Sequence, residues 1–167
     1  YNIGNANHWL PTEISMQLDI EQWKSNTVLT DDERHALKMV LGFFTTADSI
    51  AANNVVLAFY KHVTSPEVRL YMLRQAYEEA IHTQAYQYIV ESLGLNGTEI
   101  FNMYREIDAI YDKQAFVLSF NEGIFKDDFK TGTFESDQKY LENICVFSLI
   151  MEGIFFYSSF AVMFGFQ

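Results

Sequence analysis

The chain has 167 residues, enough for one domain with a hydrophobic core, and 49% of them are hydrophobic. It carries 22 acidic and 11 basic residues, a formal net charge of −11. This charge disfavours a nucleic-acid-binding protein, because phosphate contacts need a basic surface. The single cysteine, Cys145, excludes an intrachain disulfide and fits a reducing compartment, so we expect a cytoplasmic protein. We expect Cys145 to pack as a small hydrophobic side chain.

Residues 1–26 carry no long periodic pattern and predict irregular or short-helical structure. Trp9, Pro11 and Trp23 are the apolar residues with which this segment can pack on the rest of the chain. The start of the chain is polar and lacks a basic n-region, so it does not resemble a secretory signal. The first residue is Tyr1 and not Met, which leads us to expect a piece of a longer chain.

The next segment predicts a long helix over residues 30–62. Thr30 and Glu33 form a capping box at its start. An apolar stripe at helical spacing follows the capping box, and one acid, Asp48, lies within it. The inward stripe consists of Leu41, Phe44, Asp48, Ala52, Val55 and Phe59.

A second long helix is predicted from Pro66, after the capping residue Ser65, to about Gly94. Glu79, His82 and Tyr86 share one face of it, at about 100° per residue, and that face is otherwise apolar. Glu-x-x-His on a bundle helix is the half-site of di-metal carboxylate proteins. The alternative is that Glu79 is partly exposed and that His82 is a hydrogen-bonded core residue without a metal. When Glu-x-x-His occurs alone in a sequence, this alternative is the more frequent one.

The remaining sequence predicts a helix over 98–120, a glycine-containing loop over 121–133 and a last helix from about Ser136 to the end. Residues 144–166 carry one charge, Glu152, and could span a membrane by length. We favour a buried bundle helix with no membrane contact, because a lipid-facing acid is costly and no Lys/Arg cluster flanks the segment. Its expected inward stripe is Cys145, Leu149, Glu152, Phe156 and Phe160.

No strand pattern is present, so the sequence predicts an all-α bundle of long helices. Three of these helices each place an acid in an apolar stripe: Asp48, Glu79 and Glu152. Buried acids stay protonated or cost several kcal/mol unless a cation compensates them, so we expect a shared metal site that includes His82. Oxygen ligands with one imidazole suit iron or manganese better than structural zinc.

Tyr86 lies one turn from His82 on the same face. A phenol at this place could be oxidised by one electron, and an apolar pocket would protect the radical. The alternative is a core tyrosine whose hydroxyl is hydrogen-bonded. Spacing does not decide between the two.

Four stretches together resemble the small, radical-generating subunit of class I ribonucleotide reductase, in the order and approximate spacing of that family. They are Trp9-Leu-Pro-Thr-Glu-Ile, Gly42-Phe-Phe-Thr-Thr-Ala-Asp48-Ser, Glu78-Glu79-Ala-Ile-His82 with Tyr86, and Met151-Glu152-Gly-Ile-Phe-Phe156-Tyr-Ser-Ser-Phe160. The resemblance implies that residues 1–167 form a single ferritin-like di-metal carboxylate domain, incomplete at its C-terminal end.

The resemblance also implies a role for each matching residue. Asp48, Glu79, His82 and Glu152 would be ligands of a dinuclear metal centre that reacts with O₂. Tyr86 would carry the resulting tyrosyl radical, and Trp9 would relay an electron between the metal site and the large subunit. Phe156 and Phe160 would belong to the apolar pocket around the radical. The large subunit and a second copy of the chain, in a homodimer, are the implied partners.

Two departures from the family pattern matter. The family has a second Glu-x-x-His on a following helix, and this chain ends at Gln167 before it. In addition, two stretches resemble a bacterial subgroup that uses a manganese–iron pair, namely Met16–Ser25 and Tyr60–Pro66. That subgroup, however, has Glu at the position of Asp48 and Phe at the position of Tyr86. We therefore expect a di-iron centre, with Mn/Fe or Mn/Mn as alternatives.

Two alternative functions stay open. One is another ferritin-like di-metal oxidase that acts on a small hydrophobic substrate, and the other is a non-enzymatic helical module or membrane anchor.

Overall fold

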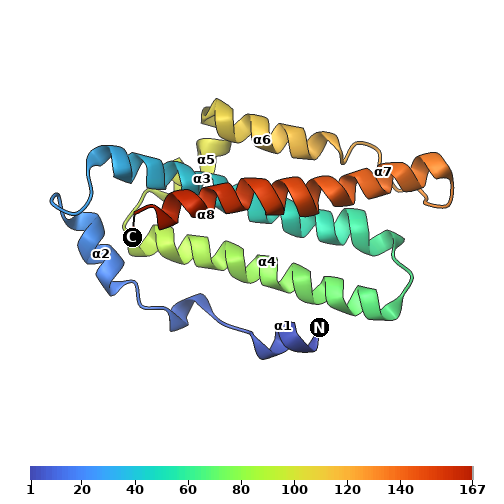
Figure 1. The fold of residues 1–167 in the computed structure, drawn as a ribbon, viewed down its shortest axis with the longest axis horizontal. Coiled ribbons are helices and arrows are strands. Elements are labelled where there is room, and N and C mark those ends of the chain that lie inside the picture. The colour runs from blue at the N-terminus through green and yellow to red at the C-terminus, as the bar shows by residue number, and fades with distance from the viewer. Residues whose placement is uncertain (167) are drawn as a thin grey trace.

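The computed structural model describes residues 1–166, and within them every regular element is a helix, as the sequence predicts (Figure 1). The helices are α1 (Asn2–Ala6), η1 (Pro11–Glu13), α2 (Gln17–Lys24), α3 (Asp31–Asn54), η2 (Val55–Phe59), η3 (Tyr60–His62), α4 (Pro66–Ser92), α5 (Gly97–Glu106), α6 (Asp108–Ser119), α7 (Phe134–Cys145), η4 (Val146–Phe156) and α8 (Tyr157–Phe164). Of the η segments, η1 and η3 are 3₁₀ turns, whereas η2 and η4 are π-helical.

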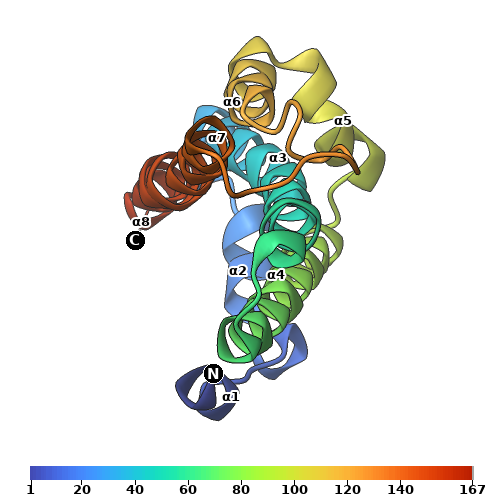
Figure 2. The same ribbon diagram turned by 90° about the vertical axis from the view of Figure 1, so that its right-hand side faces the viewer.

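Helix α3 lies at the centre of the fold, with α4 along one side and η4–α8 along another (Figure 2). Its start confirms the predicted capping box: Glu33 N–H donates to Thr30 Oγ1 at 3.2 Å, and Thr30 N–H donates to Glu33 Oε2 at 2.7 Å. Helical structure then continues through η2 and η3 to His62, as predicted.

Helix α4 runs back along α3 and confirms the second predicted helix (Figure 1). Ser65 Oγ accepts a hydrogen bond from Val68 N–H at 3.4 Å, and Pro66 occupies the first helical position. After the helix ends, Gly94 adopts a positive φ of 68°, a conformation that side chains with a Cβ rarely allow.

The helix predicted over 98–120 is in fact two helices, α5 and α6. Ile107 is extended, with φ −111° and ψ 107°, and so ends α5 and starts α6. The break lets α5 pack on α3 while α6 packs on η4, which one straight helix could not do. The predicted loop that follows is confirmed, and Gly123 and Gly132 in it have positive φ angles.

The last helix begins at Phe134, two residues before its predicted start, because Thr133 caps it. Its expected inward stripe is partly wrong. Cys145 and Leu149 are exposed, the latter at 63%, whereas Phe156 is buried. The stripe assumed α-helical spacing, and the π turns of η4 shift the phase along the segment. The expectation that Cys145 packs inside the protein is wrong for the same reason.

The N-terminal segment, with α1, η1 and α2, lies along α4 and confirms the predicted short-helical structure (Figure 1). Two hydrogen bonds join it to α4, and Arg34 of α3 donates to the carbonyl oxygens of Trp23 and Ser25 at its end. Arg74 Nη2 donates to the carbonyl oxygen of Gly4 at 2.9 Å, and Tyr88 Oη donates to that of Ile14 at 3.2 Å. This segment therefore covers one side of α4.

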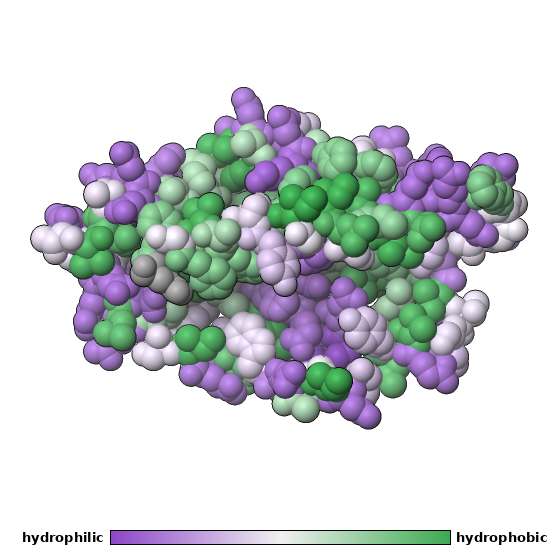
Figure 3. All heavy atoms as spheres, in the orientation of Figure 1, coloured by the Kyte–Doolittle hydropathy of each residue, from purple (hydrophilic) through white to green (hydrophobic). Residues whose placement is uncertain are grey.

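Two helical stretches, Asp31–His62 and Phe134–Phe164, are long and apolar enough to span a membrane by length and composition. More than half of the apolar window of the first stretch is buried in the fold, which is also what a core helix of a soluble protein shows. The second is less covered. Figure 3 shows hydrophobic surface along η4 and α8, where Leu149, Ile154 and Val162 are exposed, above a hydrophilic recess.

The close contact between α3 and α5 depends on a glycine. A Cβ at Gly42 would lie 2.5 Å from Met103 Sδ and 2.9 Å from Met103 Cβ. We predict that Gly42→Ala lowers the free energy of unfolding by about 1–3 kcal/mol, through overpacking, measured by urea denaturation. Gly97→Ala is the control, since its Cβ meets only Phe101 at an ordinary 3.8 Å. Equal urea midpoints for the two variants would contradict the prediction.

Candidate metal centre

Asp48 on α3 and Glu79 and His82 on α4 come together in the interior. One potential ligand atom from each lies within 4.8 Å of those of the other two. Asp48 is 1% exposed and Glu79 is 7% exposed, so two carboxyl groups share a region with little water. The structure thus brings together three of the four side chains that the sequence singles out as metal ligands.

The environment of Asp48 opposes a negative charge. Burial, followed by the charges of Glu79 and Glu152, raises the pKa of Asp48 from 3.8 to about 8, although His82 acts in the opposite direction. In addition, Asp48 Oδ2 is buried without a hydrogen-bond partner among the described residues. An unpaired buried carboxyl oxygen is uncommon in folded proteins, and a cation is one group that would satisfy it.

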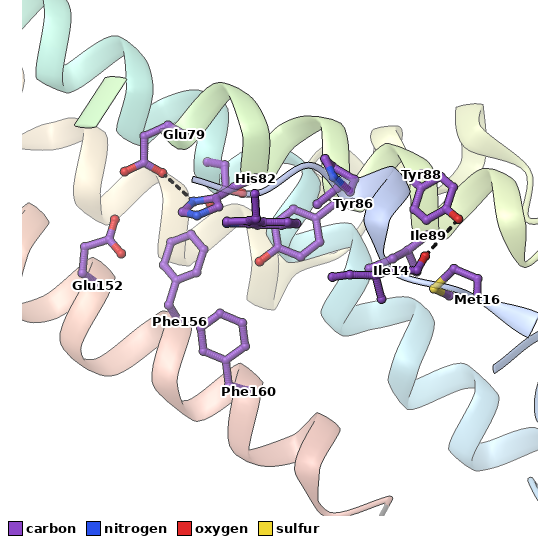
Figure 4. Close-up of a pocket in the computed structure, with 14 residues that line it drawn as sticks. Ile14, Met16, Glu79, His82, Tyr86, Tyr88, Ile89, Glu152, Phe156 and Phe160 are labelled. Carbon is purple, nitrogen blue, oxygen red and sulfur yellow. Dashed lines mark hydrogen bonds and ion pairs between the residues drawn. The ribbon is translucent and has the colours of Figure 1, made fainter. Parts of the chain in front are cut away.

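Glu152 reaches the same region from η4, opposite Glu79 (Figure 4). It does not belong to the three-residue group described above. Burial and the charge of Glu79 nevertheless raise the pKa of Glu152 from 4.5 to about 7. Glu152 is therefore electrostatically part of the site, although it lies outside the group of three.

His82 is oriented by Glu79. The two side chains are 3.2 Å apart between Nδ1 and Oε2, and this hydrogen bond is the main cause of the raised pKa of His82. The Trp9 ring lies near the imidazole of His82, with ring centroids 6.3 Å apart and planes inclined by 30°. His82 thus connects the buried carboxyl groups to the N-terminal segment.

Tyr86 lies one turn beyond His82 and is surrounded by aromatic rings. It stacks on Phe44, with centroids 4.8 Å apart and planes inclined by 13°. Phe156 and Phe160 both pack against Phe44, so the two predicted pocket residues do lie beside Tyr86 (Figure 4). The sequence had Phe44 only as a core residue, and its position one turn before Asp48 is the signal that could have identified it as part of this pocket.

The phenol of Tyr86 is held in its protonated form. Burial, followed by the charges of Asp48, Glu79 and Glu152, raises the pKa of Tyr86. Within the described residues, the hydroxyls of Tyr88, Tyr104 and Tyr140 take part in hydrogen bonds, whereas that of Tyr86 does not. The alternative of a hydrogen-bonded core tyrosine thus finds no support there.

The four acidic and imidazole side chains, Tyr86, Phe156 and Phe160 all line one cavity of about 410 Å³, and Phe44 packs behind Tyr86. Its polar side chains gather at one end, and aromatic and aliphatic ones line the rest (Figure 4). The N-terminal segment contributes Trp9, Ile14 and Met16 to its wall. Carboxylate and imidazole donors with no thiolate fit iron or manganese better than structural zinc.

A sequence model of the family described as "Ribonucleotide reductase, small chain" matches residues 1–167. The chain belongs to this family. The ribonucleoside-diphosphate reductase subunit beta of Chlamydia pneumoniae is 46% identical over 167 residues, which is 100% of this chain and 48% of that relative. The subunit of the same name from Aquifex aeolicus is 30% identical over 162 residues, or 95% of this chain and 22% of that relative.

A solved structure supports the same assignment. The ribonucleotide reductase R2 subunit from Clostridium botulinum matches with a TM-score of 0.83 and 29% identity, over 98% of this chain and 49% of that one. This likeness confirms the expected ferritin-like helical bundle. The chain thus spans about half the length, or less, of these family members.

The buried acids predict how stability depends on pH in chelator-treated protein. The folded-state pKa values of Asp48 and Glu152 are raised to about 8 and about 7, so the folded chain binds more protons than the unfolded chain between about pH 4 and pH 8. The free energy of unfolding therefore falls as the pH rises through this window, by an amount on the order of a few kcal/mol. His82, whose pKa is also raised, acts in the same direction.

Urea denaturation at several pH values measures this slope. Asp48→Asn, which cannot ionise, should reduce it and should stabilise the metal-free protein at the alkaline end of the window. A free energy of unfolding that increases with pH, or an unchanged slope in Asp48→Asn, would argue against the assigned pKa shifts.

Proposed function

We propose that this chain is the part of a ribonucleoside-diphosphate reductase small subunit that generates a tyrosyl radical for the large subunit. The proposal is supported by the family match and by the gathering of Asp48, Glu79 and His82 in a buried cluster beside Tyr86. Residues 1–167 would form one ferritin-like di-metal domain that is incomplete at its C-terminal end. Its apolar last helix would be buried in the complete bundle of a cytoplasmic homodimer.

The residues present fit a dinuclear iron centre, with Mn/Fe or Mn/Mn as alternatives. Asp48, Glu79, His82 and Glu152 would hold it, since their hard oxygen and nitrogen donors suit these ions. The unpaired Asp48 Oδ2 and the raised pKa values of Asp48 and Glu152 are the features that bound cations would relieve. When bound in its reduced form, such a centre supplies the oxidising power of O₂.

The protein's own contribution is to control one proton and one electron at Tyr86. The raised pKa keeps the phenol protonated until it is oxidised, so the electron and the proton leave the Tyr86 oxygen together. Phe44, Phe156 and Phe160 exclude water and provide no side chain that reduces the radical. The packed rings of His82 and Trp9 would then carry an electron between this site and the large subunit, where the ribonucleotide would bind.

An apolar cavity beside a metal site would also suit a hydrophobic substrate, as in other ferritin-like oxidases. The family match over residues 1–167 favours the radical-generating function instead. Turnover of such a substrate without a large subunit would support the alternative.

Tyr86 itself can be tested in protein expressed from the complete gene. After loading with Fe(II) and exposure to O₂, we predict an organic radical signal by electron paramagnetic resonance. Tyr86→Phe should abolish the signal with little change in metal content, because the ring is conserved and only the oxidisable hydroxyl is removed.

Tyr88→Phe is the matched control. Tyr88 lines the same cavity on the same helix, but its hydroxyl donates to the Ile14 carbonyl, away from the acids. A wild-type signal in Tyr86→Phe would refute the assignment of the radical.

Metal binding can be tested with two neighbouring glutamates. Glu79→Gln should weaken Mn(II) binding at least about tenfold, because it removes a buried anionic ligand. The electron paramagnetic resonance signal of unbound Mn(II) measures this affinity. Glu78→Gln should have little effect, since Glu78 forms an ion pair with Arg74 outside the site. Equal affinities for both variants would exclude Glu79 as a ligand.

A further inference from the structure

Three asparagine side chains form a buried chain at the end of the bundle away from Tyr86. Asn54 and Asn143 are 0% exposed and Asn121 is 6% exposed. Asn54 Nδ2 donates to Asn143 Oδ1 at 3.2 Å, and Asn143 Nδ2 donates to Asn121 Oδ1 at 2.5 Å and to the carbonyl oxygen of Phe120 at 3.2 Å. The chain therefore links α3, the loop after α6, and α7.

Both helices that meet in this amide chain change their winding directly beyond it. Asn54 is the last residue of α3, and the π-helical η2 follows it. Asn143 lies in the last turn of α7, and the π-helical η4 begins three residues later. π-Helical turns are rare and generally short, so a segment of 11 residues needs a reason in its surroundings.

Two contacts with α3 flank η4, one shortly before its first residue and one at its last residue. Asn143 contacts Asn54, and Phe156 packs on Phe43 and Phe44, with ring centroids 5.5 and 5.6 Å apart. In an α-helix these two positions would point about 140° apart, at about 100° per residue. At roughly 80° per residue along η4, they come within about 40° of each other.

Buried polar groups strongly favour one rotational setting of a helix about its axis, because other settings leave those groups without hydrogen-bond partners. If α7 rotated, Asn54 Nδ2 and Asn121 Oδ1 would lose their partner inside the protein, and a buried polar group without a partner is more costly than the net gain of a hydrogen bond. Asn143 is the one buried residue of α7, although the hydroxyl of Tyr140, which donates to the Phe59 carbonyl at 3.1 Å, assists at the same end. The amide chain therefore helps to fix which side of α7 faces the interior.

We propose that the amide chain Asn54–Asn143–Asn121 holds η4 in its π register and thereby aims Glu152 at the site of Asp48 and Glu79. Asn143 is a positioning residue here, since it touches none of the site residues. With the Phe156 end fixed, a change of η4 to α-helix would turn Glu152 about the helix axis by roughly 80°. The consequence for metal binding rests on the proposed function, whereas the register does not.

The exposure of Cys145 distinguishes a π-helical η4 from an α-helical one. In the π register it is exposed. With Phe156 still packed on α3, an α register would turn Cys145 to within about 20° of the Phe156 direction, toward α3. A change of register therefore protects this thiol, whereas simple destabilisation would expose it.

The experiment measures the rate at which Cys145 reacts with an aromatic disulfide in metal-free protein. Asn143→Asp keeps the shape but replaces the amide donor by an acceptor that faces the Phe120 carbonyl. We expect the reaction to slow about tenfold or more, as for a side chain that reacts only after local opening. Asn121→Ala, a milder change in the loop, should slow it in the same direction and to a smaller extent.

Two controls isolate the effect. Asn53→Asp makes the same chemical change at an exposed neighbour of Asn54 and should leave the rate unchanged. Ile154→Cys in a Cys145→Ser background is exposed in either register, so Asn143→Asp should not slow its reaction. An unchanged or faster reaction of Cys145 in both Asn143→Asp and Asn121→Ala would overturn the proposal.

Mn(II) affinity separates this inference from the proposed function. If wild-type protein from the complete gene binds no metal, the proposed function fails, and the labelling result still decides the register. If it does bind metal, Asn143→Asp should weaken the affinity while Asn53→Asp does not, and equal affinities would show that the register does not position Glu152.

Discussion

The burial of acidic side chains among aromatic rings is the constraint on which this structure depends. Asp48, Glu79 and Glu152 come from three separate helices, and each has a large part of its side chain removed from water. Their charges repel one another in a region of low dielectric, which is why the carboxyl pKa values of Asp48 and Glu152 rise toward neutrality. Such a site is unfavourable when it holds no counter-charge, and that makes it receptive to cations.

Helix α3 provides the frame in which these acids are placed. It carries Phe44, Asp48 and Asn54, which contact the aromatic pocket, the acidic site and the amide chain respectively. Because α4 and η4 both pack against this one helix, an error in the register of either would move its acid relative to Asp48. The buried amides and the stacked rings restrict that register at two separate points along α3.

Much of this arrangement follows from local sequence. The capping residues Thr30 and Ser65 mark helix starts correctly, and an acid in an apolar stripe identifies Asp48, Glu79 and Glu152 as residues of one cavity. Local sequence does not reveal where a helix breaks or where it changes from α-helical to π-helical turns. The break at Ile107 has no proline or glycine to announce it, and the π turns of η4 arise from contacts with α3 that are remote in sequence. The predicted inward facing of Cys145 and Leu149 was wrong because it assumed uniform α-helical spacing.

The attachment of the N-terminal segment has a further consequence for access to the site. Trp9 is carried by a stretch that two hydrogen bonds and a few ring contacts fasten to α4, whereas the acids belong to the interior of the bundle. Segments with so few buried contacts open at a lower free energy than core helices do. The segment that carries Trp9 can thus open while the acidic side chains of α3, α4 and η4 stay enclosed in the bundle.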